Sequence, residues 1–280
     1  MQTCTYAGHT LTWEEHSAGA QTLIFLHGFS DSRRGWLPLI ERLAPIGRCV
    51  SLDLPGHGLA RPPAGYCALT QDQLLTIMTY AVQQIAGHQP VTLVGHSTGG
   101  LVALGVASRL AGCVARVVAL NSVVWGPLSG MLGFAQWLLR HQMYRVFWGM
   151  WRVTQLSPIA MMYGLTFYVC QQRAHWRNPL TWRVCRDSYP WYRRQPLRHL
   201  AILLNLLEAC DIRPLLCNLT LPVLAITGEY DPIVPVEQSR WLAAHLPGAQ
   251  VHILPRIGHL AHLEAPAICE QAIRAWLARR

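Results

Sequence analysis

Short apolar runs alternate with amphipathic stretches over most of the chain. Residues 22–27, 48–52 and 114–120 have the length and apolar character of strands that are covered on both faces. Between the first two runs, apolar side chains recur at helical spacing over residues 36–43. Strands that alternate with helices in this way predict an α/β protein with a mostly parallel sheet and helices on both faces.

Further elements are predicted outside these runs. Residues 3–6 and 11–15 are predicted as the strands of an opening hairpin. Thr70 with Gln73 forms a capping box at the start of a helix between the strands at 48–52 and 114–120. The elements predicted near the C-terminus are strands at 222–227 and 250–254 and helices at 235–246 and 265–278.

The alternation stops between residues 123 and 214. This segment is helical in pattern and contains seven of the eleven tryptophans and eleven arginines, against three acidic residues. We therefore predict a core formed by residues 1–122 and 215–280, with residues 123–214 inserted as a helical cap.

The stretch V-T-L-V-G-H-S-T-G-G-L at residues 91–101 carries the clearest chemistry. An apolar run precedes G-x-S-x-G and an alanine-rich helical pattern follows it, which is the strand–turn–helix context of a nucleophile elbow. Side chains at Gly95 and Gly99 would collide across such a bend. Ser97 is therefore the predicted nucleophile.

Composition narrows the class of protein. The 280 residues are 51% hydrophobic and 13% charged, which is typical of a globular protein with a sizeable core. No apolar stretch reaches the about 18 residues of a membrane span, and the polar N-terminus lacks a signal-peptide pattern, so we expect a cytoplasmic protein. The nine scattered cysteines indicate free thiols.

The net charge of +9 comes from 23 basic residues that are all arginine. No groove-reading module accompanies this charge, so we do not expect nucleic-acid binding. The elbow lacks the G-x-G-x-x-G spacing of a dinucleotide site, and no histidine cluster suits a metal. We expect neither a cofactor nor a metal.

Four further motifs accompany the elbow, each beside a predicted element. They are L-H-G-F at 26–29, D-L-P-G-H-G at 53–58, G-E-Y-D-P-I-V-P at 228–235 and R-I-G-H-L-A-H-L-E-A-P at 256–266. The five motifs stand in the order seen in α/β-hydrolases, and outside the cap the chain resembles that superfamily. A serine at the elbow resembles the carboxylesterases and lipases, whereas haloalkane dehalogenases and epoxide hydrolases have an aspartate there.

This resemblance implies a set of catalytic roles. Ser97 attacks an ester, His259 is the base that stands last in the chain, and Asp231 holds the imidazole. The backbone amides of Phe29 and Thr98 form the oxyanion hole. The implied activity is hydrolysis of carboxylic esters of small to medium acyl chains through an acyl-enzyme.

Other residues compete for these roles. Four histidines do so: His27, His57, His96 and His262. We expect the first two to hydrogen-bond their own loops, the third to point away from the nucleophile, and the fourth to pack or cap near the last helix. Asp53 is interpreted as part of a structural turn, and Asn121 ends a strand with an amide that cannot supply a charge.

The cap is expected to shape the substrate pocket, with Trp125, Trp137 and Trp148 as predicted substrate contacts. Three interpretations of its basic, aromatic helices stay open. They pack on the core with their arginines in water, they line an apolar acyl pocket, or they rest on anionic lipid as a peripheral membrane surface. A monomer and a homodimer are equally compatible with the sequence.

Two other functions stay open. One is a carbon–carbon lyase or hydrolase of the menaquinone-pathway type, whose elbow carries an arginine directly after the G-G where this chain has Leu101. The other is a non-catalytic receptor or signalling relative that retains the triad. A turnover assay separates the second from an ester hydrolase.

Overall fold

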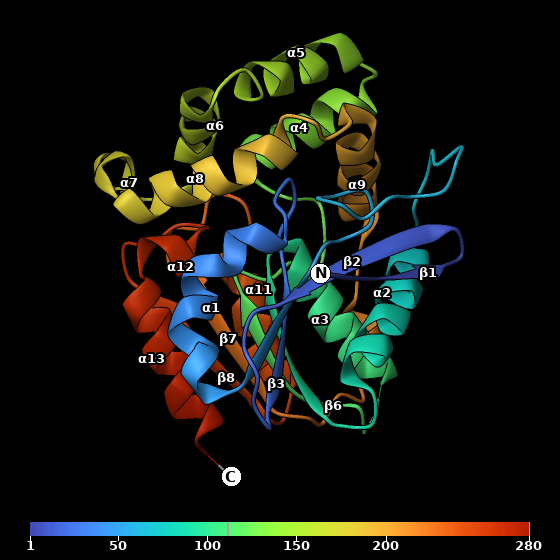
Figure 1. Cartoon of the computed structure of the whole chain (residues 1–280). Helices are drawn as coiled ribbons and strands as arrows, with labels where there is room; N and C mark the ends of the chain where they lie inside the picture. Colours follow the sequence, from blue (N-terminus) through green and yellow to red (C-terminus); the bar gives the residue numbers. More distant parts are fainter. Residues whose placement is uncertain (111, 280) are drawn as a thin grey trace.

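The computed structural model describes residues 1–110 and 112–279. Its centre is an eight-stranded sheet in the order β1-β2-β4-β3-β5-β6-β7-β8 (Figure 1). The strands are β1 Gln2–Tyr6, β2 His9–Glu15, β3 Thr22–Leu26, β4 Arg48–Leu52, β5 Val91–His96, β6 Val114–Leu120, β7 Val223–Gly228 and β8 Ala249–Leu254. The β1–β2 and β2–β4 pairs are antiparallel and the others are parallel, so the predicted mostly parallel sheet is confirmed.

The central strands are buried along their whole length. Every residue of β3, β5 and β7 is buried, as expected for strands that are covered on both faces. The predicted bounds of β4 and β6 match the structure, and those of the other strands differ by one or two residues at an end.

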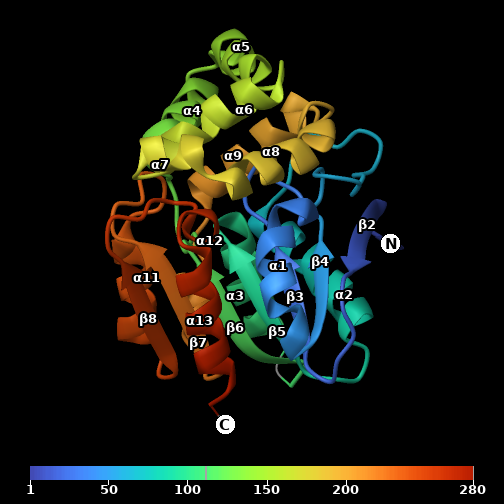
Figure 2. The same ribbon diagram turned by 60° about the vertical axis from the view of Figure 1, so that its left-hand side comes forward.

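Helices cover both faces of the sheet (Figure 2). One face packs against α1 and α13, where Trp36, Leu39 and Ile273 join the same apolar cluster as Phe25 and Val94 of the sheet. The opposite face packs against α2, α3 and α11. These helices are α1 Leu37–Leu43, α2 Gln71–Ala86, α3 Thr98–Arg109, α11 Val236–His245 and α13 Pro266–Leu277.

The capping box predicted at the start of α2 is present in the structure. Thr70 Oγ1 accepts from Gln73 N at 3.1 Å, and Gln73 Oε1 accepts from Thr70 N at 2.9 Å. This reciprocal pair is the predicted capping box, and it satisfies two backbone donors that the helix itself leaves free.

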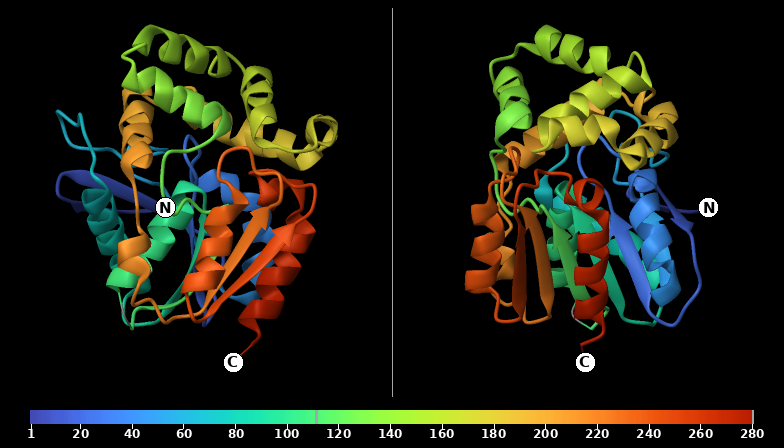
Figure 3. Two further views of the ribbon diagram at one scale, coloured as in Figure 1. Left: turned by 180° about the vertical axis from the view of Figure 1, so that it is seen from behind. Right: turned by 90° about the vertical axis from the view of Figure 1, so that its left-hand side faces the viewer.

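Between β6 and β7 the chain forms a helical insertion that lies over the edge of the sheet where the parallel strands end (Figure 3). Its helices are α4 Gly130–Arg140, α5 Tyr144–Thr154, α6 Pro158–Leu165, η3 Thr166–Tyr168, α7 Gln172–Arg177, α8 Pro179–Tyr192, α9 Leu197–Ala209 and α10 Arg213–Leu216. In the part of the chain that the structure describes, no helix has both the length and the apolar character to cross a bilayer.

The remaining short elements are η1 Arg33–Trp36, η2 Ala44–Ile46 and α12 Ala261–Glu264. The last helix was predicted over residues 265–278, and the structure begins α13 one residue later, after a separate turn of helix at α12. Pro266 stands at the first position of α13, where the missing N–H costs no hydrogen bond.

A buried ion pair holds together the loops beneath the insertion. Arg33 Nη1 donates to Asp53 Oδ2 at 2.6 Å, and the side chains are 2% and 0% exposed. The other carboxylate oxygen accepts from Arg33 N at 2.8 Å, and Leu59 N donates to Oδ2 at 2.9 Å. Asp53 therefore serves the turn that follows β4, as the sequence indicates.

We expect Arg33→Met to destabilise the fold by about 3–5 kcal/mol, because it leaves the Asp53 carboxylate buried without its partner. The measurement is urea unfolding followed by circular dichroism. The matched control is Arg109→Met, which breaks an ion pair to the 81% exposed Asp72. That variant should lose less than about 1 kcal/mol. Equal losses in the two variants would contradict a special role for the buried pair.

Candidate active site

The structure places Ser97 at a sharp turn between β5 and α3. Its backbone has φ 54° and ψ −116°, a conformation that residues with a side chain rarely adopt. Ser97 N donates to Leu120 O at 2.9 Å, while Ser97 O accepts from Gly100 N at 2.9 Å and Val123 N at 3.1 Å. Three elements therefore hold the turn in place.

Glycines make this turn possible. A Cβ on Gly95 would collide with the carbonyl of Gly99, and a Cβ on Gly99 would collide with the carbonyls of Leu26 and His27. The steric reason predicted for both glycines is therefore present in the structure. The result is a serine at the head of α3 whose side chain reaches the cavity described below.

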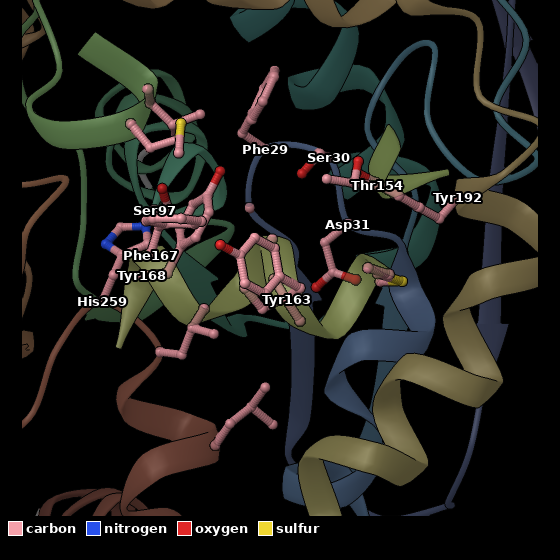
Figure 4. A pocket seen from close by; sticks show the side chains of 18 of the residues that line it. Phe29, Ser30, Asp31, Ser97, Thr154, Tyr163, Phe167, Tyr168, Tyr192 and His259 are labelled. Atoms are coloured by element: carbon pink, nitrogen blue, oxygen red, sulfur yellow. The ribbon is translucent and has the colours of Figure 1, made fainter. Parts of the chain in front are cut away.

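His259 and Asp231 meet at the same edge of the sheet. His259 Nδ1 lies 2.8 Å from Asp231 Oδ2, and the two side chains are 3% and 0% exposed. The other carboxylate oxygen accepts from Ile233 N at 2.8 Å and Val234 N at 2.9 Å. Because Nδ1 donates its hydrogen to the carboxylate in this hydrogen bond, Nε2 of the neutral ring is free to act as an acceptor, and His259 lines the same cavity as Ser97 (Figure 4).

Asn121 is the residue whose role sequence reasoning missed. Its Nδ2 donates to Asp231 Oδ2 at 2.8 Å and to Gly258 O at 3.1 Å. An amide cannot replace the charge of an acid, but it can orient one. The available signal was topological: Asn121 directly follows β6, the strand that pairs with β7 before Asp231.

The segment that carries His259 is bound to the insertion. His259 N donates to Tyr168 O at 2.7 Å. Glu264 accepts from Gly258 N and from Cys170 N, both at 3.0 Å, and its burial raises the pKa of the carboxyl. A single side chain therefore ties the histidine loop to residues that follow η3.

The other histidines have structural roles. His27 Nδ1 donates to Gly28 O at 2.8 Å and His57 Nδ1 donates to Pro55 O at 3.2 Å, so both bond their own loops as predicted. Burial lowers the pKa of these two rings to about 4 and about 3, which keeps them neutral. His96 Nε2 donates to His259 O at 2.9 Å, and its own burial lowers its pKa well below the usual range.

His262 is also buried and lines the same cavity as Ser97 and His259. Its ring is 5.1 Å from that of Trp36 and 4.6 Å from that of His96, measured between centroids. Burial lowers the pKa of His262 to about 3. It therefore packs at α12, which is one of the two roles expected from the sequence.

The two backbone amides expected to bind an oxyanion, those of Phe29 and Thr98, belong to segments that adjoin Ser97. A Cβ on Gly28 would lie 3.2 Å from Ser97 Cβ, so the loop before Phe29 passes directly beside the serine. Thr98 is the first residue of α3, whose N-terminus favours negative charge. Within residues 1–110 and 112–279, neither Phe29 N nor Thr98 N donates to a protein acceptor, so both are available to a ligand.

The cavity beside Ser97 has a volume of about 410 Å³ and a mostly apolar wall. Its aromatic lining comes from Phe29, Trp151, Tyr163, Phe167, Tyr168 and Tyr192. Figure 4 shows a polar corner away from Ser97, with Asp31, Ser30 and Thr154. Burial and the nearby Asp53 raise the pKa of Asp31 to about 7.

The three tryptophans predicted to contact substrate do not line this cavity. Trp137 and Trp148 are 40% and 47% exposed. Trp125 packs its ring against Trp241 and beneath the Arg213 guanidinium. The tryptophan that does line the cavity is Trp151 of α5, which is 5% exposed.

Comparison with known proteins gives two curated relatives of similar length. A pimeloyl-[acyl-carrier protein] methyl ester esterase of Nitrosomonas europaea is 27% identical over 264 residues, which cover 90% of this chain and 94% of the relative. A putative 2-succinyl-6-hydroxy-2,4-cyclohexadiene-1-carboxylate synthase of Bacillus subtilis is 26% identical and covers 94% and 93% of the two chains.

Among solved structures, an esterase from a Rhodococcus species superimposes with a TM-score of 0.79 at 21% identity, covering 99% of this chain and 98% of that one. At this level of identity the match shows a shared fold. The family model described as alpha/beta hydrolase fold matches residues 21–266, which include the insertion. The chain therefore belongs to the α/β-hydrolase fold family.

Proposed function

We propose that the protein is a serine hydrolase of carboxylic esters. The observation that carries this proposal is the strained Ser97 turn at the wall of a cavity that is also lined by His259, which pairs with Asp231. A serine is a weak nucleophile until a base removes its proton, and a histidine held by a carboxylate is such a base. The name of the Nitrosomonas europaea relative, a methyl ester esterase, supports the same reaction class.

Each step uses a group already described. Ser97 Oγ attacks the ester carbonyl carbon and its proton passes to His259 Nε2, while Asp231 stabilises the imidazolium. The amides of Phe29 and Thr98 donate to the tetrahedral oxyanion. The imidazolium then returns the proton to the leaving alcohol. Water attacks the acyl-enzyme by the same route and releases the acid.

The cavity sets the substrate class. A volume of about 410 Å³ with a mostly apolar wall suits an acyl group of small to medium length. The nucleophile and His259 form one part of that wall, so the acyl chain extends past Phe29 and Trp151 toward the polar corner at Asp31. The relative from Nitrosomonas europaea is named for a methyl ester, which supports a small alcohol group.

The carbon–carbon lyase alternative has less support. Leu101 stands at the position where the menaquinone-pathway enzymes carry an arginine, and it is fully buried in the apolar core. Along the described cavity wall there is no arginine to bind a substrate carboxylate. A non-catalytic role is separated from hydrolysis by the turnover measurement that follows.

We expect p-nitrophenyl esters from acetate to palmitate to be hydrolysed with an optimum at short or medium chain length, since the cavity limits the acyl group. Ser97→Ala should abolish this rate and covalent labelling by a fluorophosphonate. Ser30→Ala, a second serine in the cavity wall, is the matched control and should keep the labelling. Labelling that persists in Ser97→Ala would place the nucleophile elsewhere.

Asp231→Asn should lower kcat by roughly 10⁴-fold, because the amide favours the wrong imidazole tautomer. Steady-state kinetics with the best ester measures this loss. Glu229→Gln, which changes an exposed carboxylate in the same turn, is the control and should leave kcat near that of the wild type. A near-normal rate for Asp231→Asn would assign the acid to another residue.

Asp31 should make the fold less stable as pH rises. Its pKa is about 7 in the fold against 3.8 in the unfolded chain, so the unfolded chain releases this proton first. Between pH about 5 and about 8 we expect a loss of about 1–2 kcal/mol, after allowing for the partial exposure of Asp31.

Asp31→Asn should remove this loss, so that the variant gains stability relative to the wild type at the higher pH. Urea unfolding of both proteins at the two pH values measures the difference. An unchanged difference between variant and wild type would show that Asp31 ionises normally.

A further inference from the structure

Exposed apolar side chains gather on one part of the insertion. Of the 15 large apolar residues that are exposed in the described chain, 11 lie between Phe134 and Phe167. Five of them form what we call the mouth-rim patch: Val153, Leu156, Ile159, Tyr163 and Phe167. Their exposed fractions are 56%, 74%, 62%, 58% and 41%.

This patch surrounds the opening of the cavity. Val153, Tyr163 and Phe167 are exposed and also line the cavity, so they stand where it meets the surface. Ile159 lies four residues before Tyr163 and therefore on the same face of α6. Leu156 lies in the short connection between α5 and α6, between Val153 and Ile159, and is exposed.

The charge beside the patch has one sign. Arg145 and Arg152 are exposed on α5, and neither enters an ion pair with any residue that the structure describes. The sequence contains no aspartate or glutamate from residue 73 to residue 186. Three other arginines of the insertion are paired with acidic residues: Arg140 with Glu208, Arg183 with Glu41 and Asp187, and Arg213 with Asp211.

We propose that the mouth-rim patch docks on an anionic lipid surface. The apolar and aromatic side chains enter the boundary between headgroups and acyl chains, and Arg145 and Arg152 contact lipid phosphates. The cavity then opens toward the lipid. On the function proposed above, an ester dissolved in the lipid layer reaches Ser97 without crossing water; this last step rests on that function, and docking itself does not.

A second copy of the chain fits the same surface less well. An isologous contact brings each patch against its own equivalent. It would therefore bring together the uncompensated arginines of both copies, with no acidic residue of α4 to α7 to balance them. A lipid surface with anionic headgroups supplies the missing charge.

The test is co-sedimentation with vesicles of phosphatidylcholine alone and of phosphatidylcholine mixed with phosphatidylglycerol. The protein carries Ser97→Ala, so that the lipids stay intact and docking is measured without hydrolysis. We expect binding to the mixed vesicles at low salt, weaker binding at high salt and little binding to phosphatidylcholine alone.

Two double variants separate the contribution of the arginines to vesicle binding from that of the apolar side chains. Arg145→Gln with Arg152→Gln should weaken binding to the mixed vesicles by about twentyfold, since each basic residue near an anionic leaflet contributes about fivefold. Leu156→Ser with Ile159→Ser should weaken it by at least about tenfold. The matched control is Ile253→Ser with Ile268→Ser, which removes two exposed isoleucines of β8 and α13 and should bind as before.

Three outcomes would overturn the proposal. They are equal binding to the two kinds of vesicle, retention of full affinity by both double variants, and absence of binding to either vesicle by folded protein. Size-exclusion chromatography is run in parallel. A dimer that Leu156→Ser with Ile159→Ser dissociates would assign the patch to an interface between copies and would also contradict lipid docking.

Discussion

The backbone of Ser97 is the constraint on which the rest of the site depends. Its positive φ is held by hydrogen bonds to β6 and to the start of α3, and it exists only because Gly95 and Gly99 leave space for carbonyl groups. The parallel topology then brings Asp231 and His259 to the edge of the sheet where the parallel strands end, which is also where Ser97 lies. Asp231 follows β7 and His259 follows β8, two neighbouring strands that end beside the serine.

Much of the core could be predicted because its signals are local. Apolar runs predicted the bounds of β4 and β6, and the need for Gly95 comes from a collision with the carbonyl of Gly99, which lies in the same short motif. Asn121 could not be found in this way. Its contact with Asp231 joins residues 110 positions apart, and it depends on which strands are neighbours in the sheet.

The insertion was harder to predict, although its position and composition were clear. Trp148 and Trp151 are separated by less than one helical turn, yet the first is 47% exposed and the second 5%. Apolar side chains cover more than half of the circumference of α5, all but the side of Arg145 and Arg152, so periodicity does not define which part of this wide apolar arc faces inward. That rotation is decided by the packing of Trp151 on Phe29, a contact that no sequence window contains.

The contacts between the insertion and the loop that carries His259 limit which segments can be exchanged with those of a relative. Tyr168 O and the Glu264 carboxylate hold the two segments together, and a Cβ on Gly258 would lie 2.6 Å from Cys170 N. The insertion is thus not an interchangeable module. A chimera that takes its helices from a relative must take the matching histidine loop as well, because the two were shaped as a single contact surface.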